Sequence, residues 1–129
     1  MPDMLVKLYD LPDLHEPLCR TKAIGIETRR PNPWEKSILL EWVESTFGSA
    51  WALECEAAFA ANPPSCYLAV EKETPIGFAC YDCTRKNFFG PTGVAEAARG
   101  KGVGLSLLLA CLHAMRDDGY AYAIIGGVG

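Results

Sequence analysis

The sequence predicts an α/β protein with a mixed (α+β) sheet and helices on its faces. Apolar runs of strand length alternate with amphipathic stretches of helix length, and a glycine-rich loop joins a strand to a helix near residue 100. The chain has 129 residues, of which 50% are hydrophobic and 22% charged, as in one folded domain. We therefore expect a single domain over residues 1–129.

The first 60 residues predict two strands and then two helices. Residues 5–9 and 23–29 are the candidate strands, with a loop at the prolines between them. The run from Asn32 to Glu35 is typical of a helix start, with a capping asparagine, a proline in the first turn and a glutamate that completes a capping box. This helix should end at Gly48, and a second one should run from Ser49 to the prolines after residue 62.

The second half predicts three strands, a helix and a last strand. Residues 66–71 and 76–82 are β-prone and lie at hairpin spacing, so they should pair antiparallel. Residues 88–94 form a shorter strand, which Gly90-Pro91 makes irregular or places on an edge. From Gly102 to Asp117 the apolar residues share one helical face, and residues 120–125 read as a buried strand.

Charge and hydropathy exclude several classes of partner. The net charge is −4 and the pI about 5.1, so the overall field repels nucleic acid and anionic lipid. No apolar run approaches the roughly 20 residues of a membrane span, and the first residues lack the pattern of a signal peptide. We expect a cytoplasmic protein that binds neither nucleic acid nor membrane and holds any anionic ligand at a local site.

The cysteines predict neither disulfides nor a metal site. All six lie in scattered, mostly apolar contexts, where reduced cysteines serve as small core residues. Cys80 and Cys83 have C-x-x-C spacing, but in a continuous strand side chains three apart point to opposite faces. The expected metal content is therefore none.

The glycine-rich loop between residues 94 and 104 carries the clearest functional signal. Free N–H groups and the dipole at a helix N-terminus attract anions, glycines let a ligand approach the backbone, and Arg99 and Lys101 add positive charge. The loop is not a P-loop, because Ala95 and Gly102 stand where the first glycine and the hydroxyl belong. It is not a dinucleotide fingerprint either, because Leu105 stands where the last glycine belongs.

The loop resembles the pyrophosphate-binding motif [QR]-x-x-G-x-[GA] of the GNAT acetyltransferases, which Arg99 to Gly104 satisfies after Val94 at the strand end. The order of elements over residues 23–129 is also similar to that family, although Glu96 replaces a usual proline. The resemblance implies a GNAT acyl-CoA N-acyltransferase fold, with acetyl-CoA as co-substrate and a small-molecule or peptide amine as acceptor. It also implies the residues that would bind the cofactor: Thr92, Gly93, Val94, Arg99, Gly100, Lys101, Gly102, Val103, Gly104 and Leu105.

The catalytic residues cannot be assigned from the resemblance. Many family members place an acid on the strand after the motif helix and a tyrosine on the next helix, but residues 120–126 contain no carboxylate and the chain ends at Gly129. The chain is then part of a longer protein, or is completed by a partner, or is a non-catalytic acyl-CoA-binding module; a purely structural interaction domain is a further alternative. If the strand at residues 120–125 has an open edge, the end of the chain from Tyr120 to Gly129 should form a homo-oligomer.

Overall fold

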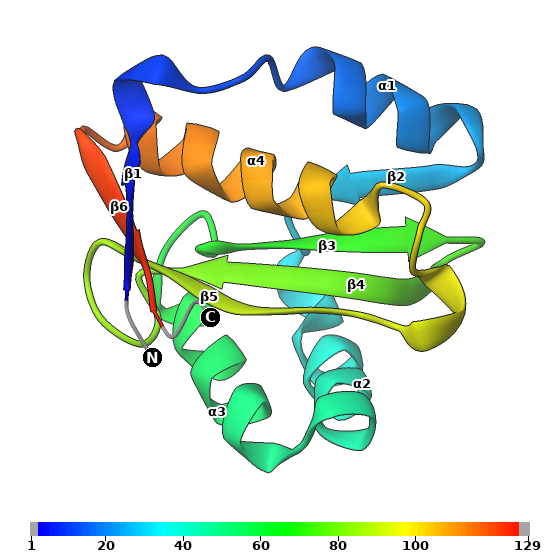
Figure 1. The fold of residues 1–129 in the computed structure, drawn as a ribbon. Coiled ribbons are helices and arrows are strands. Elements are labelled where there is room, and N and C mark those ends of the chain that lie inside the picture. The colour runs from blue at the N-terminus through cyan, green and yellow to red at the C-terminus, as the bar shows by residue number, and fades with distance from the viewer. Residues whose placement is uncertain (1–2, 127–129) are drawn as a thin grey trace.

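The computed structural model describes residues 3–126, which form a six-stranded mixed sheet (Figure 1). The strand order is β1-β6-β5-β4-β3-β2, and every neighbouring pair is antiparallel except β5 and β6, which are parallel. The strands are β1 Met4–Lys7, β2 Ile26–Arg29, β3 Cys66–Glu71, β4 Thr74–Tyr81, β5 Phe88–Val94 and β6 Tyr122–Ile125. The helices are α1 His15–Ala23, α2 Lys36–Phe47, α3 Ser49–Ala57 and α4 Val103–Asp117. The mixed α/β fold predicted from the sequence is confirmed.

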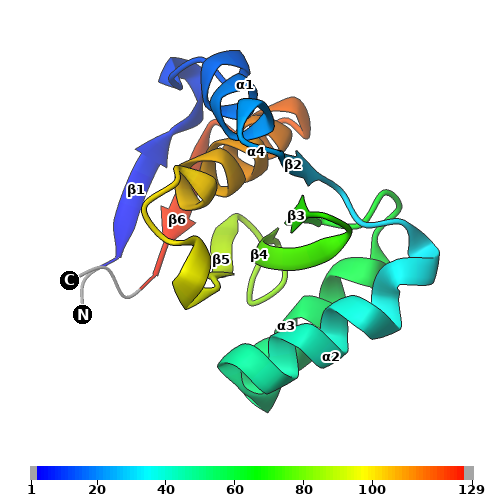
Figure 2. The same ribbon diagram turned by 90° about the vertical axis from the view of Figure 1, so that its right-hand side faces the viewer.

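Two helical layers cover the sheet, with α1 and α4 on one face and α2 and α3 on the other (Figures 1 and 2). The alternation of side chains along β3 and β4 explains both layers. Ala69 and Ala79 point into the core under α4, whereas Leu68 and Phe78 point into the core under α2 and α3. These strands are apolar on both faces because both faces are buried.

Helix α1 is absent from the sequence prediction, which placed a loop at Pro12 and Pro17 and a strand from Ala23. The prediction was wrong because Pro17 lies in the first turn of α1, where a backbone N–H has no intrahelical partner to lose. The side chain of Asp13 accepts a hydrogen bond from the N–H of Glu16 at 3.1 Å, which supports the helix start. Strand β2 consequently begins only at residue 26.

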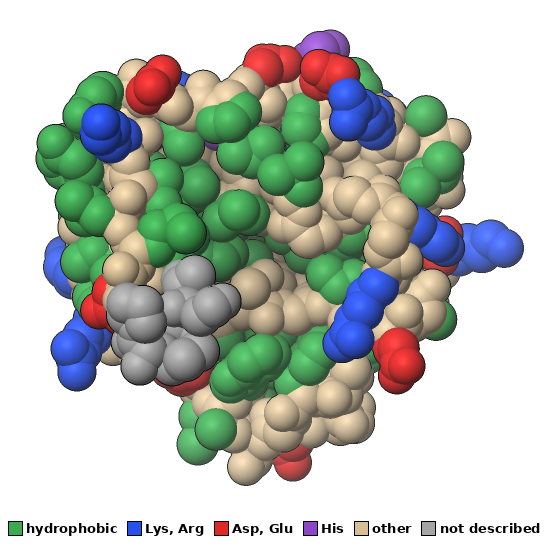
Figure 3. All heavy atoms as spheres, in the orientation of Figure 1, with side chains coloured by type: hydrophobic (Ala, Val, Ile, Leu, Met, Phe, Trp, Pro, Cys, Tyr) green, Lys and Arg blue, Asp and Glu red, His purple; other side chains and the backbone are tan. Residues whose placement is uncertain are grey.

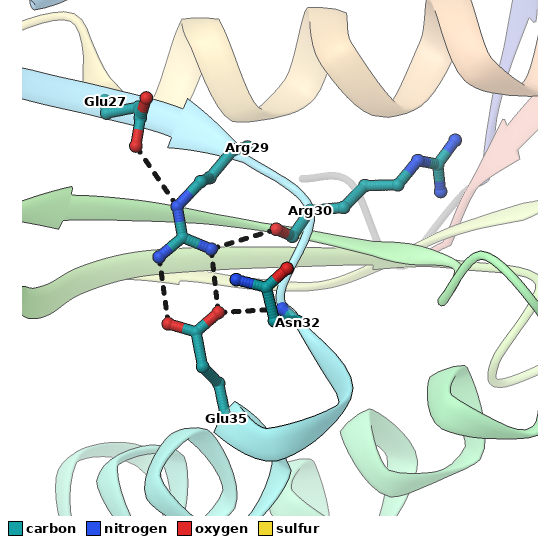
Figure 4. Close-up of polar contacts among 5 residues, drawn as sticks. All are labelled: Glu27, Arg29, Arg30, Asn32 and Glu35. Atoms are coloured by element: carbon teal, nitrogen blue, oxygen red, sulfur yellow. Dashed lines mark hydrogen bonds and ion pairs between the residues drawn. The ribbon is translucent and has the colours of Figure 1, made fainter.

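The predicted capping box before the first long helix is confirmed, although it opens a 3₁₀ turn over Pro33–Glu35 and α2 begins at residue 36. Glu35 accepts a hydrogen bond from the N–H of Asn32 at 2.7 Å and two from the Arg29 guanidinium at 2.8 and 2.9 Å (Figure 4). The Arg29 guanidinium, followed by the Asn32 N–H, lowers the pKa of Glu35 to about 2. These hydrogen bonds connect Arg29 of β2 to the turn that precedes α2.

The N-terminal strand covers the edge of β6. β1 pairs antiparallel with β6 from Met4 opposite Ile125 to Lys7 opposite Tyr122 (Figure 2). The expectation of an open β6 edge was therefore wrong, and the homo-oligomer predicted from that edge loses its basis. Residues 127–129, which belonged to the same predicted interface, lie outside the described residues.

Candidate functional site

Among residues 3–126, no strand pairs with β5 beyond Phe89 on the side away from β4, which leaves a gap in the middle of the sheet. The parallel pairing is confined to Phe88 with Ile124 and Phe89 with Ile125, whereas β5 continues along β4 to Val94. The N–H of Ala95 donates to the carbonyl of Ile76 at 2.8 Å and so sets the alternation of the β4–β5 ladder. The backbone groups of Val94 and Thr92 therefore face away from β4, toward the gap, where an extended ligand can pair with them. The Val94 carbonyl already accepts a hydrogen bond from Nε of Arg99 at 3.3 Å.

A cavity of about 450 Å³ occupies this gap. Its walls are mostly apolar and come from β5, β6, the loop before α4 and α4 itself. They are formed by Phe89, Thr92, Gly93, Val94, Arg99, Gly104, Leu108 and Ile125. In Figure 3 the face is hollowed near its centre, hydrophobic side chains line the hollow, and Lys and Arg side chains lie on the side toward the loop before α4.

Gly93 lets the helical layer approach β5 closely. A Cβ atom at this position would lie 2.6 Å from Cζ of Phe47, the last residue of α2. The Phe47 ring packs against Trp42, Trp51 and Phe78, so it has little room to move. The hydroxyl of Thr92 donates to the Phe78 carbonyl at 3.1 Å and fixes the strand beside it.

The loop after β5 leads into the N-terminus of α4 without a side-chain cap. Gly100 and Gly102 have φ values of +82° and +83°, a left-handed conformation that glycine adopts without strain. Gly102 is the capping position and offers no side chain, so the N–H groups of residues 103–105 have no partner within the helix. Together with the helix dipole and the exposed Arg99 and Lys101, they give this end of α4 the positive character that suits an anion.

The structure brings the predicted site residues to one place. Thr92, Gly93, Val94, Arg99 and Gly104 line the cavity. Gly100, Lys101, Gly102 and Leu105 are exposed at its rim, along the loop and the first turn of α4. Val103 differs, because its side chain is buried against the sheet and only its backbone can face a ligand.

Sequence reasoning missed three lining residues: Phe89, Leu108 and Ile125. Leu108 could have been found, because it lies one helical turn after Gly104 and so shares its face. Phe89 and Ile125 reach the cavity only through the parallel pairing of β5 with β6, which no local pattern indicates.

A second hollow of about 440 Å³ lies beside the first and shares Phe89 with it. It contains two carboxylates from distant parts of the chain, Asp3 and Glu54, together with Trp51 and Arg85. Glu54 accepts a hydrogen bond from the Thr84 hydroxyl at 2.8 Å. An Asp3 carboxylate oxygen lies 3.6 Å from where a Cβ would stand at Gly126, so β1 brings an acid to the end of β6, which has none of its own.

Residues 36–128 match the family described as Acetyltransferase (GNAT) family, which covers more than half of the chain. The chain belongs to the GNAT acetyltransferase family. Acyl transfer is the general chemistry that this fold supports. No curated protein matches the sequence.

Solved structures share the fold of this GNAT chain at low sequence identity. A GCN5-related glucosamine N-acetyltransferase region of a fungal multi-domain GH3 β-N-acetylglucosaminidase has a TM-score of 0.76 and 16% identity, covering 98% of this chain and 18% of that one. A GCN5-related N-acetyltransferase from Sphaerobacter thermophilus has a TM-score of 0.74 and 20% identity over 98% of this chain and 44% of that one. The present chain therefore spans less than half of either protein.

A GNAT family acetyltransferase from Brucella melitensis, solved in complex with acetyl-CoA, is similar over 81% of this chain and 77% of that chain. Its TM-score is 0.64 and its identity 19%, which shows a common fold. Among the described residues of the GNAT chain, no helix has the length and apolar character needed to cross a membrane.

Proposed function

We propose that this chain transfers an acetyl group from acetyl-CoA to an unidentified amine. The observation that carries the proposal is the gap between β5 and β6, which ends at the uncapped N-terminus of α4. A ligand with an extended arm and a pyrophosphate has matching partners there. Backbone groups of β5 suit the arm, and free N–H groups with two cationic side chains suit the phosphates.

The cofactor residues take separate roles in this arrangement. Thr92, Gly93 and Val94 would hold the pantetheine arm as an added strand, while residues 99–105 would surround the pyrophosphate. The apolar side chains of Phe89, Leu108 and Ile125 would contact the arm and exclude water from it. The thioester would then lie beside Val94.

The chemistry needs a neutral amine, a donor for the developing oxyanion and a proton for the departing thiolate. The amine nitrogen bonds to the thioester carbon, the carbon–sulfur bond breaks, and the proton lost by the amine balances the charge of the released thiolate. The N–H of Val94 faces the gap and can donate to the oxyanion.

The second hollow suits the acceptor. It adjoins the cavity at Phe89, so an amine bound in it would approach the thioester from the side opposite the pyrophosphate loop. The two carboxylates of Asp3 and Glu54 outnumber the one guanidinium of Arg85, and Trp51 and Phe88 supply apolar surface for the rest of the molecule. This charge pattern favours a cationic acceptor, whose reacting nitrogen must lose its proton before it attacks the thioester.

Two measurements test the proposal. Calorimetric titration should show binding of CoA and acetyl-CoA, and chromatography should detect CoA released from acetyl-CoA with at least one amine of a panel of peptides, polyamines and amino sugars. Binding without release for every amine would instead support a non-catalytic acyl-CoA-binding module. Absence of binding would contradict both and leave an interaction domain.

A further inference from the structure

Four of the six cysteines pack together in the core on the face of the sheet that α2 and α3 cover. Cys55 lies on α3, Cys66 is the first residue of β3, and Cys80 lies near the end of β4. All three are completely buried, and their sulfur atoms lie within 4.8 Å of one another. Cys66 and Cys80 are also direct neighbours across the β3–β4 ladder.

Cys83 approaches the same cluster from the turn after β4. Contrary to the sequence prediction, Cys80 and Cys83 do not lie in one continuous strand, because β4 ends at Tyr81 and Asp82 has a φ of +57°. This turn brings Cys83 back against the same cluster, where its thiol donates to the Tyr81 carbonyl at 3.4 Å. The Ser65 hydroxyl lies 3.7 Å from the Cys83 sulfur.

The two remaining cysteines show that this convergence is specific. Cys111 lies on α4 and is buried against the opposite face of the sheet, where its thiol donates to the Ala79 carbonyl at 3.6 Å. Cys19 is exposed on α1. Cys111 is explained by burial as a small apolar residue. The same explanation does not account for four cysteines from a helix, two strands and a turn that pack against one another.

We propose that Cys55, Cys66, Cys80 and Cys83 bind a zinc ion. Thiolates are preferred zinc ligands, and tetrahedral coordination with Zn–S bonds of about 2.3 Å places the sulfurs about 3.8 Å apart. The sulfurs of Cys55, Cys66 and Cys80, already within 4.8 Å of one another, need only small side-chain shifts to reach that spacing. Cys83, which packs against this cluster, would turn toward it as the fourth ligand. When Cys83 is a thiolate, the Ser65 hydroxyl can donate a hydrogen bond to it, as residues around a metal site do for the metal ligands.

Four protein ligands leave no open position for water or substrate, so the site is structural. It would connect α3 to β3 and β4 through the core that also contains Phe78 and Leu39. None of the four cysteines lines either hollow described above, so the proposal is independent of the acetyl-transfer function.

The full chain, expressed with added zinc and purified under reducing conditions without chelator, should contain one zinc per chain by elemental analysis. Replacement by Co²⁺ should give the sulfur-to-cobalt charge-transfer band and the intense visible bands of tetrahedral thiolate coordination. Cys55→Ser and Cys66→Ser should lose the zinc and the cobalt spectrum. Cys111→Ser, a buried cysteine outside the cluster, and Cys19→Ser should keep both.

A wild-type measurement decides the matter if the buried variants do not fold. Removal of zinc by a strong chelator should lower the melting temperature, and re-addition of zinc should restore it. A folded wild-type chain with no bound metal, no cobalt spectrum and a melt that chelator leaves unchanged would overturn the proposal. A mass lower by two hydrogens per cysteine pair without reductant, with no metal bound, would overturn it in favour of disulfides.

Discussion

Gly102 occupies the N-terminal cap of α4 with a φ of +83° and leaves the first N–H groups of the helix unobstructed. A side chain here would stand where an anion would approach the proposed pyrophosphate site. The nearest atom to a Cβ built at this position is 4.0 Å away on Thr21, so packing alone would accept a larger residue. The backbone conformation therefore favours glycine here, lack of space does not, and in the proposed site glycine also keeps the N–H groups accessible.

Gly102→Glu should weaken CoA binding at least about tenfold, or about 1.4 kcal/mol, because it puts bulk and negative charge at the anion site. Any residue other than glycine at this φ also costs about 1–2 kcal/mol of stability. Gly102→Gln has the same strain without the charge, so the difference between the two variants measures the electrostatic part. Calorimetry with CoA and a thermal melt separate binding from folding.

Gly119→Glu is the matched control, since Gly119 has a φ of +105° just after the opposite end of α4. It should lose similar stability and keep its CoA affinity. Unchanged CoA binding in folded Gly102→Glu would remove the pyrophosphate role from this loop.

For single residues, the sequence predicts the role when that role depends only on neighbours in the chain. Gly100, Gly102 and Arg99 could be placed in the site because glycines at a strand–helix junction signal unusual backbone conformation and anion access. Asp3 could not be placed, because it reaches Gly126 only when β1 pairs with β6. Contacts between distant segments have no signature within either segment.

The start of α2 shows how an element can be fixed by one side chain. Glu35 is 24% exposed and Arg29 31% exposed, so their paired hydrogen bonds are only partly screened by water. The same carboxylate closes the capping box with Asn32 (Figure 4). The junction of β2 with α2 therefore depends on Glu35 being ionised.

Because its folded-state pKa of about 2 lies below the ordinary value of 4.5, Glu35 stabilises the fold above pH 4.5, and this stabilisation is lost as the pH falls toward 2. Glu35→Gln should reduce the free energy of unfolding at pH 7 by about 1–3 kcal/mol and should lose less stability than wild type on acidification. Denaturant titrations between pH 7 and pH 2.5 measure both effects.

Glu27→Gln serves as the control. Glu27 also contacts Arg29, at 3.1 Å, but is 66% exposed, so its removal should cost less than about 1 kcal/mol. Equal pH profiles for wild type and Glu35→Gln would show that the Arg29 pair does not stabilise the start of α2.

Elements with strong local signals were predicted well, and those without were not. The capping box predicted α2, the hairpin spacing predicted β3 and β4, and the apolar face of an amphipathic helix predicted α4. Helix α1 was missed because its proline was read as a loop signal, although it stands in a first turn where proline is tolerated. The hydrophobic pattern of so short a helix is too weak to outweigh that reading.

At the scale of the whole molecule, β1 covers the edge of β6 and α1 covers part of α4. α1 packs against α4, where the Ser106 hydroxyl donates to the Pro17 carbonyl at 3.1 Å, and β1 pairs with β6. The sequence predicted a strand at residues 5–9 but could not place it, because a weakly alternating edge strand suits either edge of a sheet. In the structure β1 pairs with β6 and so keeps the edge of β6 from pairing with another chain.

The alternation of the β1–β6 ladder allows a direct test of that protection. The N–H of Leu8 donates to the Ala121 carbonyl at 2.9 Å, so Val6, two residues earlier, also directs its N–H toward β6, while Leu5 directs its N–H to solvent. Val6→Pro should remove a ladder hydrogen bond, detach β1 and cost about 1–3 kcal/mol. With the β6 edge exposed, the chain should self-associate.

Leu5→Pro introduces the same ring on the same strand at a position where proline suits an edge. It should keep the wild-type melting temperature and association state, and sedimentation velocity at matched concentrations compares the three proteins. Val6 packs partly against the core under α4, so Val6→Ala measures the packing loss that proline adds to the hydrogen-bond loss. If Val6→Pro sediments and melts like Leu5→Pro, the pairing with β1 is not what protects β6, and the edge must be protected by side chains of β6 itself.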